Sequence, residues 1–420
     1  MTRRTRRALC VTSNFPRWEG DSTTPFVLHL AQDLREHGWE VDVLAPHAPG
    51  AALRETLGGL RVERFRYAFP ESAETVCYQG GALVNLRRRP LEKLKLPALV
   101  AAEWAAVWRR LVAGRYDVLH SHWVLPQGFV GMLASRLPRV RHVITLHGGD
   151  LFGLRGPLLN GFKRSALRCA DAVTVNSSFT EAAVRELCPD LTTVRRIPMG
   201  VRTEPLSTEE RELAARLRAE HAPSRGPLLV FVGRAVEEKG LGDALDALAL
   251  LRAGRGAADG GGASGAARLL VVGEGQDRAR FEARAAELGV ADAVSFVGWV
   301  DPAAVRAHMA AGDIFVGPSR TGPDGWVEAQ GLTFIEAMAV GTAVVGTRLG
   351  GIPDAVRHEE TGLLVEERSP EQIAGAVRRL WEDLDLRQTL AESGQRLARG
   401  EFSRVSSAEK FAAVFERVGE

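Results

Sequence analysis

The sequence predicts an α/β protein made of two domains, each with a parallel sheet. Short apolar, strand-like runs alternate with helix-like runs almost from end to end, which is typical of parallel sheets covered by helices on both faces. The chain has 420 residues, more than one ordinary core holds. A stretch with two prolines and a glycine, Ile197–Ser207, separates two such series. We therefore expect two Rossmann-like domains that face each other across a cleft.

The first series opens with a short apolar run, Ala8–Ser13, and a helix over Pro25–His37. Apolar residues recur in that helix at helical spacing, and Gly38 stands where a positive φ ends a helix. The strands expected next are Glu40–Pro46, Leu60–Tyr67, Asp117–His122, Val143–His147, Ala172–Asn176 and Val194–Met199. Helices are expected at about 98–113, 126–136, 157–169 and 178–187.

The second series predicts six further strands, at Leu228–Val232, Leu269–Gly273, Ala293–Val297, Ile314–Val316, Ala343–Gly346 and Leu363–Val365. Residues 252–268 are rich in Gly, Ala and Ser and predict a flexible surface loop. Ser403–Val418 has the apolar spacing of an amphipathic helix. We expect domains at 1–203 and 204–398, and a C-terminal helix within 399–420 that packs back toward the N-terminal domain.

Composition narrows the class of protein. Hydrophobic residues make up 45% and charged residues 25%, as in an average globular protein, and the formal charge of +2 gives no reason to expect a nucleic-acid partner. The four cysteines are scattered without metal-ligand spacing, so we expect a reduced, cytoplasmic protein without structural zinc. The sequence has no run of about 18 apolar residues, so no transmembrane helix is expected. The basic N-terminus lacks the apolar segment of a signal peptide.

Two cations follow the strand Leu228–Val232. In open parallel sheets ligands bind beyond the carboxyl ends of the strands, so the segment after each strand matters most. Here Gly233 lets the backbone approach a ligand, and Arg234 and Lys239 lie on the loop that opens the next helix. A helix N-terminus flanked by cations suits a diphosphate.

Two glutamates follow the strand Ile314–Val316. Glu328 is expected in a long loop and Glu336 in the first turns of the helix behind it. Carboxylates so placed can accept hydrogen bonds from sugar or ribose hydroxyls. Exposed amides of three residues at the helix start can meet phosphate oxygens, namely Gly331, Leu332 and Thr333.

In these motifs the chain resembles the retaining GT-B glycosyltransferases of family GT4, the glycosyl transferases group 1. In the second half the matching segments are FVGRAVEEKG, VVGEG, FVGWV and EAQGLTFIEAMA, the last with the E-x7-E spacing of that family. The first half resembles a bacterial branch of the family through FPRWEGDSTTPFVLHLA, HSHWVLPQG, TLHGGDLF and GPLLNGFKRSALRCADAVTVNS.

The resemblance implies a hexosyltransferase that works without a metal or cofactor. It would move a hexose-type sugar from a nucleotide diphosphate, UDP in preference to GDP, to a hydroxyl of a small-molecule or lipid-linked acceptor, with retention at the anomeric carbon. The donor would bind between the two domains. The protein would be cytoplasmic, with peripheral contact at the inner membrane face as a further expectation. The oligomeric state is left open.

The resemblance also assigns roles to residues. Arg234 and Lys239 would hold the donor diphosphate, Glu336 the ribose, and Glu328 would lie near the transferred sugar. His147, in LHGGD at a strand end, would touch the donor sugar. Gly273–Gly275 and Val297–Trp299, which include Gly275 and Val297, would line the nucleoside side through backbone groups.

The first loop departs from the family pattern. Many members have a Gly-Gly pair before the first helix, where the backbone meets the donor phosphates. Here the place reads Ser22-Thr23-Thr24-Pro25, with Gly20 as the nearest glycine. Proline lacks an N–H, so this loop either keeps a weakened phosphate contact or faces the acceptor.

Several other side chains have two interpretations. His120 and His122 are expected to pack in the core, with acceptor binding as the alternative. The run Arg87–Arg89 followed by PLEKLKL predicts a solvated loop, with contact to an anionic membrane or lipid-linked acceptor as the alternative. The spacing of Trp104 and Trp108 places both in the core. Trp18 and Trp123 lie near strand ends and could stack on a sugar.

Other functions were weighed against sugar transfer. An epimerase or phosphorylase could use the same scaffold, and a catalytically weak subunit could keep only ligand binding. A dinucleotide-dependent redox enzyme would need GxGxxG after a strand, where this chain reads SNFPRWEGD. The intact set of Arg234, Lys239, Glu328 and Glu336 favours an active transferase.

Overall fold

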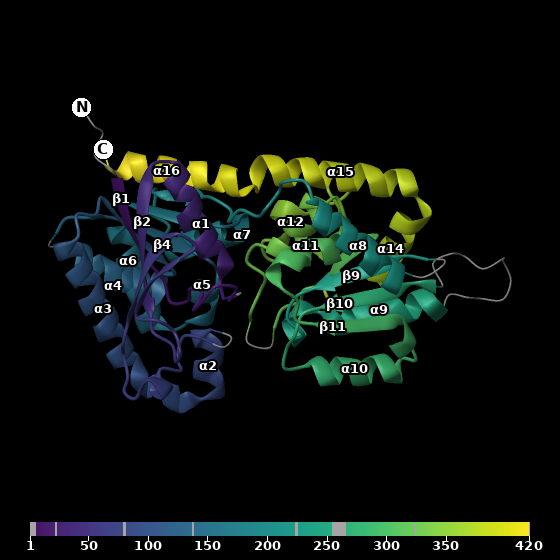
Figure 1. Ribbon diagram of the computed structural model, residues 1–420, viewed down its shortest axis with the longest axis horizontal. Coiled ribbons are helices and arrows are strands. Elements are labelled where there is room, and N and C mark those ends of the chain that lie inside the picture. Colours follow the sequence, from purple (N-terminus) through teal and green to yellow (C-terminus); the bar gives the residue numbers. More distant parts are fainter. Residues whose placement is uncertain are drawn as a thin grey trace. The chain divides into compact units, whose positions relative to one another are not determined.

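The computed structural model describes residues 6–21, 23–78, 81–136, 138–222, 226–253, 266–322 and 325–419. The chain divides by its internal contacts into two units (Figure 1). Unit 1 comprises Met1–Gly200 and Arg404–Glu420, and unit 2 comprises Val201–Ser403. Each unit is built on one sheet. The prediction of two α/β parallel-sheet domains is therefore confirmed.

Unit 1 has an eight-stranded sheet in the order β3-β4-β2-β1-β5-β6-β7-β8. Neighbouring strands are parallel, except that β3 runs antiparallel to β4. The strands are β1 (Arg6–Val11), β2 (Trp39–Pro46), β3 (Arg54–Leu57), β4 (Leu60–Phe65), β5 (Val118–His122), β6 (Arg141–Leu146), β7 (Ala172–Val175) and β8 (Val194–Arg196). The apolar pattern does not predict β3, because three of its four side chains are at least partly exposed.

The helices of unit 1 cover this sheet. They are α1 (Pro25–Glu36), η1 (Glu71–Ala73), α2 (Ala82–Arg88), η2 (Pro90–Lys95), α3 (Leu96–Ala113), η3 (Val124–Gly128), α4 (Phe129–Ser135), α5 (Gly149–Gly153), α6 (Pro157–Cys169), α7 (Ser178–Leu187) and α16 (Arg404–Gly419). Helix α3 packs against α4, α4 packs against α6, and α1 packs against α16.

Helix α16 joins the first unit although it ends the chain. Its Phe415 ring meets Trp39 edge-on with centroids 5.2 Å apart, and Arg404 forms an ion pair with Asp33 of α1. The helix spans Arg404–Gly419, within one residue at each end of the predicted Ser403–Val418, and it follows a helix that continues to Glu401.

Unit 2 has a six-stranded, wholly parallel sheet in the order β11-β10-β9-β12-β13-β14. Its strands are β9 (Leu228–Val232), β10 (Arg268–Val272), β11 (Val294–Gly298), β12 (Ile314–Gly317), β13 (Ala343–Thr347) and β14 (Leu363–Val365). Its helices are α8 (Thr208–His221), η4 (Glu237–Lys239), α9 (Leu241–Ala253), α10 (Arg278–Glu287), η6 (Ala291–Ala293), α11 (Pro302–Ala311), α12 (Leu332–Ala339), α13 (Ile352–Ala355), α14 (Pro370–Glu382) and α15 (Leu384–Glu401).

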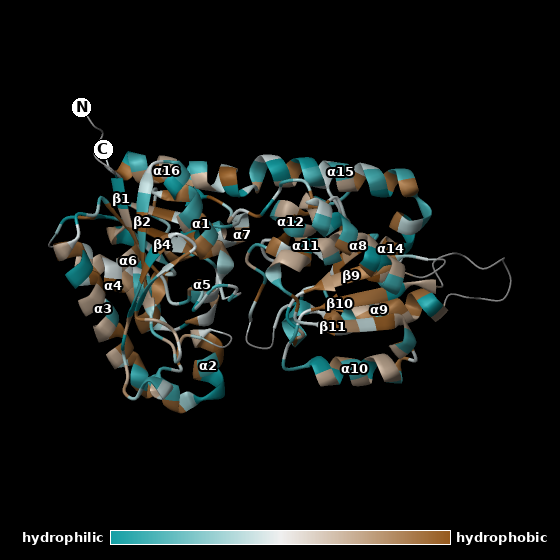
Figure 2. Ribbon diagram, in the orientation of Figure 1, coloured by the Kyte–Doolittle hydropathy of each residue, from teal (hydrophilic) through white to brown (hydrophobic). Residues whose placement is uncertain are grey.

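The unit 2 strands are apolar along most of their length, as sheets covered on both faces require (Figure 2). Side chains on one face pack with α9, α10 and α14, and those on the other pack with α12 and α15. The start of α8 shows why the chain turns helical there. The Ser207 side chain accepts from the Glu210 amide and the Glu210 carboxylate accepts from the Ser207 amide, a reciprocal cap.

Two expectations are wrong. The segment after Arg87 is not a loop, because α2 and η2 occupy it. Trp104 and Trp108 are not in the core, since 42% and 39% of their surfaces are exposed. The centre of the predicted loop at 252–268, residues 254–265, lies outside the described residues.

Candidate active site

Three loops meet at the carboxyl edge of the unit 2 sheet, where β10, β9 and β12 are neighbours. Gly240 ends η4 with φ +73°, and a Cβ there would lie 1.7 Å from the carbonyl oxygen of Pro318. Gly273 has φ +127°, and a Cβ there would lie 2.1 Å from the Gly233 oxygen. No side chain fits at either place, so backbone packing fixes these loops against one another.

Arg234 and Lys239 lie on the loop after β9. The Arg234 side chain is 49% exposed, and its guanidinium is 3.7 Å from the Glu238 carboxylate. The ammonium of Lys239 lies 2.5 Å from the Glu328 carboxylate and 4.8 Å from the centre of the Trp326 ring. The structure thus brings Lys239 and Glu328 into direct contact, although 89 positions separate them.

The Glu328 carboxylate is held in its charged form. Burial alone would raise its pKa, but the charge and hydrogen bond of Lys239 and the backbone amides of Gly331 and Gln330 keep the pKa below its usual value. The Gly331 amide is therefore already engaged by Glu328. Of the three amides expected to meet phosphate, those of Leu332 and Thr333 remain in the first turn of α12.

Glu336 lies one turn further along α12 and has a different environment. Burial raises the pKa of its carboxyl to about 7, and the charge of Arg306 opposes that shift only in part. Within the described residues, no hydrogen-bond donor reaches this carboxylate. The carboxyl is thus poised between its two forms near neutral pH.

Of the positions expected on the nucleoside side, Gly275 also has a structural role. A Cβ at Gly275 would lie 2.2 Å from the Ala235 oxygen, so a glycine is needed for the loop after β10 to pack on the loop after β9. Val297 lies half-buried in β11, next to the strand end. Both positions border the edge that carries Arg234.

Sequence reasoning missed Arg320 and Trp326. Arg320 follows β12, and its guanidinium is 2.8 Å from the Glu237 carboxylate and 3.4 Å from that of Asp243. Its amide also donates to the Glu238 oxygen, so it ties the loop after β12 to η4. The sequence did carry a signal for Arg320, because this residue is a cation that follows a strand end, as Arg234 is. The stacking of Trp326 on Lys239 has no such signal in the sequence.

In unit 1 the ends of β5 and β6 bring two histidines together. The His122 Nδ1 lies 2.9 Å from the His147 Nε2, and the two rings are nearly parallel with centroids 5.2 Å apart. His120 is turned elsewhere and contacts the Thr145 hydroxyl at 2.7 Å. The packing interpretation of His120 and His122 fits their burial, and His122 also contacts the predicted site residue directly.

These histidines are neutral at physiological pH. Burial lowers the pKa of His147 to about 3, and burial together with His120 and His147 lowers the pKa of His122. The rings of Phe26 and Trp123 each lie 5.0 Å from the His147 ring. Since one nitrogen of a neutral pair must donate and the other accept, each ring fixes the orientation of the other.

Buried hydrogen bonds fix the Gly148-Gly149-Asp150 segment that follows His147. Asp150 is buried, and its carboxylate accepts from the Val124 amide at 2.6 Å. Lys163 of α6 is buried as well and donates to the Leu151 oxygen at 2.8 Å. The Gly-Gly-Asp segment therefore sits on a polar support between η3 and α6.

The first loop closes on itself through Asp21. The Asp21 carboxylate accepts from the Arg17 side chain at 2.7 Å and from the Thr23 amide at 3.2 Å. Arg17 also stacks on Trp18, which is 45% exposed. Ser22 lies outside the described residues, and a donor-phosphate contact of this loop stays a prediction.

In the described part of the chain, no group of three or more His, Cys, Asp or Glu side chains is placed to hold a metal ion. The cysteines Cys10, Cys77, Cys169 and Cys188 are unpaired.

Two family models match the chain. "Glycosyltransferase Family 4" matches residues 24–205, and "Glycosyl transferases group 1" matches residues 215–397. A GDP-mannose-dependent alpha-(1-6)-phosphatidylinositol monomannoside mannosyltransferase from Mycobacterium tuberculosis is 31% identical over 68% of this chain and 72% of its own length. A D-inositol 3-phosphate glycosyltransferase from Acidothermus cellulolyticus is 34% identical over 69% and 66%. The crystal structure of Anabaena Alr3699/HepE in complex with UDP is similar in fold, with a TM-score of 0.72, 19% identity, and coverage of 98% of this chain and 100% of that one.

Proposed function

Because the chain belongs to the family 4, group 1 glycosyltransferases with the GT-B fold, we propose that Arg234, Lys239, Glu328 and Glu336 form its nucleotide-sugar site. The observation that carries the proposal is the gathering of these side chains at the carboxyl edge of the unit 2 sheet. Two cations and a charged carboxylate lie there on loops fixed by glycines, and a carboxyl of shifted pKa lies on the helix α12 that follows.

The two cations suit the leaving group. When the bond between the anomeric carbon and the diphosphate oxygen breaks, negative charge builds on the diphosphate and the sugar becomes oxocarbenium-like. Arg234 can grip two phosphate oxygens, and Lys239 adds a point charge. The pairing of Lys239 with Glu328 supports a position of the ammonium next to the sugar end, because Glu328 is the residue proposed to lie near the transferred sugar.

Glu336 suits a ribose. A carboxylate that lacks donors within the described residues can accept from two vicinal hydroxyls at once. Binding of the ribose would then compensate the burial that raises the pKa of Glu336.

In unit 1, taken by itself, His147 is the residue proposed to contact a sugar. A neutral imidazole, oriented by His122, can hydrogen-bond a sugar hydroxyl without placing a positive charge beside an oxocarbenium-like ring. Trp18, exposed in the first loop, is a candidate stacking surface for the acceptor.

The reaction needs no separate base from the chain in this scheme. The acceptor oxygen forms the new bond to the anomeric carbon, the bond to the diphosphate oxygen breaks, and the acceptor proton passes to the departing phosphate. In this scheme the transfer retains the configuration of the anomeric carbon, uses no metal and takes a UDP-sugar as donor. The relative named for GDP-mannose makes GDP-mannose the first alternative donor, and the relative named for D-inositol 3-phosphate supports a small hydroxylated acceptor.

Thermal unfolding of the full chain with a panel of nucleotides tests the donor site. A ligand that binds the folded state at 100 times its dissociation constant adds about 2.7 kcal/mol to the free energy of unfolding. We expect a clear shift with UDP and a UDP-hexose, whereas a shift with GDP-mannose alone would reassign the base. No shift with any nucleoside diphosphate would contradict the proposal.

Product analysis then tests the transfer. Mass spectrometry of donor and acceptor mixtures should show an acceptor heavier by one hexose unit, and the anomeric signal of the product by NMR should match that of the donor. An inverted anomer would contradict retention while leaving the donor site intact.

A further inference from the structure

Helix α3 of unit 1 is apolar on both its buried and its exposed face over residues 96–108. A surface helix normally turns charged side chains outward. The buried face of α3 is apolar apart from Glu103, which is 1% exposed. The exposed side chains between residues 96 and 108 are all apolar, namely Pro97, Ala98, Ala101, Trp104, Ala105 and Trp108. The two indole rings lie stacked, with centroids 6.2 Å apart.

The segment directly before α3 also exposes apolar side chains. Leu91 and Leu94 of η2 are 78% and 79% exposed, far more than core-forming leucines. Lys93 lies between them, and Arg88 and Arg89 precede them, all exposed. We call this set of seven side chains the Trp104 surface: Arg88, Arg89, Leu91, Lys93, Leu94, Trp104 and Trp108.

The charge of this surface has one sign. Residues 81–113 are all described, and their only acids, Glu92 and Glu103, are both buried. The nearest exposed acid along the chain is Glu71 of η1. Three exposed cations thus border an apolar stripe without acids of that segment to neutralise them.

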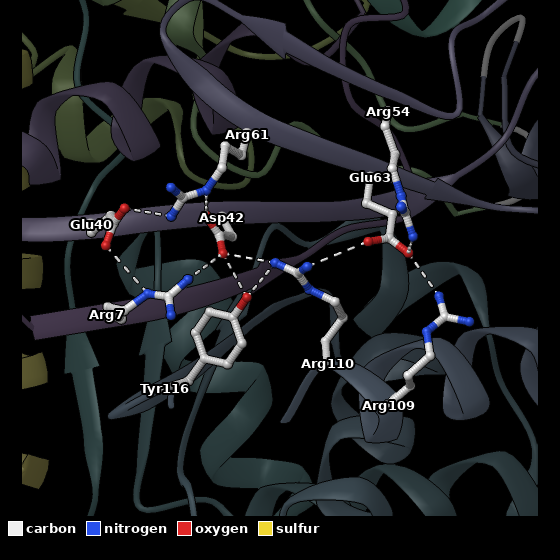
Figure 3. Close-up of polar contacts among 9 residues, drawn as sticks. All are labelled: Arg7, Glu40, Asp42, Arg54, Arg61, Glu63, Arg109, Arg110 and Tyr116. Atoms are coloured by element: carbon white, nitrogen blue, oxygen red, sulfur yellow. Dashed lines mark hydrogen bonds and ion pairs between the residues drawn. The ribbon is translucent and has the colours of Figure 1, made fainter. Parts of the chain in front are cut away.

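Two arginines near the C-terminal end of α3 tie this helix to strands of the unit 1 sheet (Figure 3). Arg110 of α3 forms an ion pair with Asp42 of β2 at 2.8 Å, and Arg109 forms one with Glu63 of β4 at 2.7 Å. The Asp42 carboxylate also binds Arg7, Arg61 and Tyr116. At the other end, Lys95 of η2 donates to the Ala73 oxygen at 2.8 Å. The outward side chains therefore need little ordering when they meet a partner.

We propose that the Trp104 surface binds the headgroup region of an anionic membrane. Indole rings and leucines enter the headgroup boundary while arginine and lysine meet anionic lipids, the combination that interfacial helices use. A second copy fits less well, because a two-fold contact would bring the cations of both copies into one interface without an exposed acid of this segment to pair with them. None of the described helices is long and apolar enough to cross a bilayer, so the contact would be peripheral.

Vesicle flotation of the full chain tests this. We expect binding to phosphatidylcholine vesicles that contain about 30 mol% phosphatidylglycerol and little binding to phosphatidylcholine alone. The double variant Arg88→Gln/Arg89→Gln should lower the partition coefficient about 25-fold, since each cation near the surface contributes about fivefold. Trp104→Ala/Trp108→Ala should lower it about tenfold or more.

Matched variants in unit 2 serve as controls. Trp299, 58% exposed, and the exposed arginines Arg216 and Arg399 carry the same substitutions elsewhere. Trp299→Ala and Arg216→Gln/Arg399→Gln should leave flotation unchanged, and thermal unfolding should show that every variant is folded. Equal losses in test and control variants would overturn the proposal.

Two further results would overturn it. One is equal flotation on neutral and anionic vesicles. The other is a dimer, seen by light scattering in the absence of lipid, that Trp104→Ala/Trp108→Ala dissociates, because the surface would then join two copies. The proposal does not rest on sugar transfer, so the nucleotide-induced thermal shift should persist in Arg88→Gln/Arg89→Gln and in Trp104→Ala/Trp108→Ala whichever way flotation turns out.

Discussion

The carboxyl edges of the two sheets differ in how they handle charge. In unit 2 the edge carries charged groups that water reaches, with Arg234 half exposed and Lys239 and Glu328 exposed by 21% and 15%. In unit 1 the same edge carries His122 and His147, which burial keeps neutral. The first arrangement suits a dianionic leaving group, and the second suits an uncharged sugar or acceptor that hydrogen bonds must orient.

This difference also explains why one edge is easier to recognise in a sequence. The function of a charged side chain after a strand end can be inferred from its residue type, because a cation there suggests an anionic ligand. A neutral histidine works through the partner that orients it, and that partner is visible only in three dimensions. Variants that separate charge from orientation can therefore test the comparison.

The largest effect is expected from the cations of unit 2. Lys239→Ala and Arg234→Ala should each lower kcat about 100- to 1,000-fold, as removal of one preorganised charge-stabilising group does. The free energy of unfolding should change little in Arg234→Ala, because this side chain is half exposed and lies 3.7 Å from the Glu238 carboxylate. It should fall further in Lys239→Ala, because Glu328 then loses the cation that offsets its burial. Steady-state kinetics and thermal unfolding measure both. Arg216→Ala, an exposed cation on α8, is the control, and wild-type turnover in both site variants would refute the assigned roles.

The backbone that supports these cations comes next. Gly240→Ala should lower the free energy of unfolding by about 2 kcal/mol or more, since φ is +73° and the new Cβ would meet the Pro318 oxygen at 1.7 Å. Gly375→Ala, an exposed position of helix α14 with open space around it, should instead stabilise by about 0.5–1 kcal/mol. Denaturant unfolding of the two variants measures the contrast. Equal changes would mean that the loops after β9 and β12 are not fixed by their contact.

A smaller effect is expected in unit 1. His147→Ala and His122→Ala should each lower kcat/KM about tenfold, because the loss of either ring removes the hydrogen bond that orients the other. The double variant should then be little worse than either single variant, and a double-mutant cycle measures that coupling. His142→Ala, which disturbs a different contact with Ser121, serves as control. Additive losses would show that His122 does not position His147.

The sequence predicted the strands, and the positions of Arg234 and Lys239 after a strand end, for one reason. Buried strands need continuous apolar runs, and a cation directly after such a run is visible in the sequence, so both leave a local signal. The edge strand β3 left no such signal, because most of its side chains are exposed and need not be apolar. Gly275 illustrates a different limit, since a glycine that serves a ligand and one that packs on Ala235 look alike in sequence.

Trp104 and Trp108 show the sharpest failure. Helical spacing of apolar residues indicates that a helix has an apolar face. Sequence reasoning then assigns that face to the core. Helix α3 packs its other face inward, with Leu99, Val107 and Leu111 beside the buried Glu103. Which face is covered depends on contacts between distant segments, and spacing alone does not encode it.

The smallest effect concerns Glu336 and pH. Its folded-state pKa, about 7, lies above the usual 4.5, so the folded protein binds the extra proton and this group's contribution to stability falls as pH rises from about 4.5 to about 7. A ribose binds the charged form, so nucleotide affinity should rise about threefold between about pH 6.5 and 7.5 as that form becomes dominant. Calorimetric titration of the nucleotide at both values measures it. Glu336→Gln should bind more weakly and lose this slope, whereas an unchanged slope would assign the pH dependence to the phosphates and leave Glu336 without its role at the ribose.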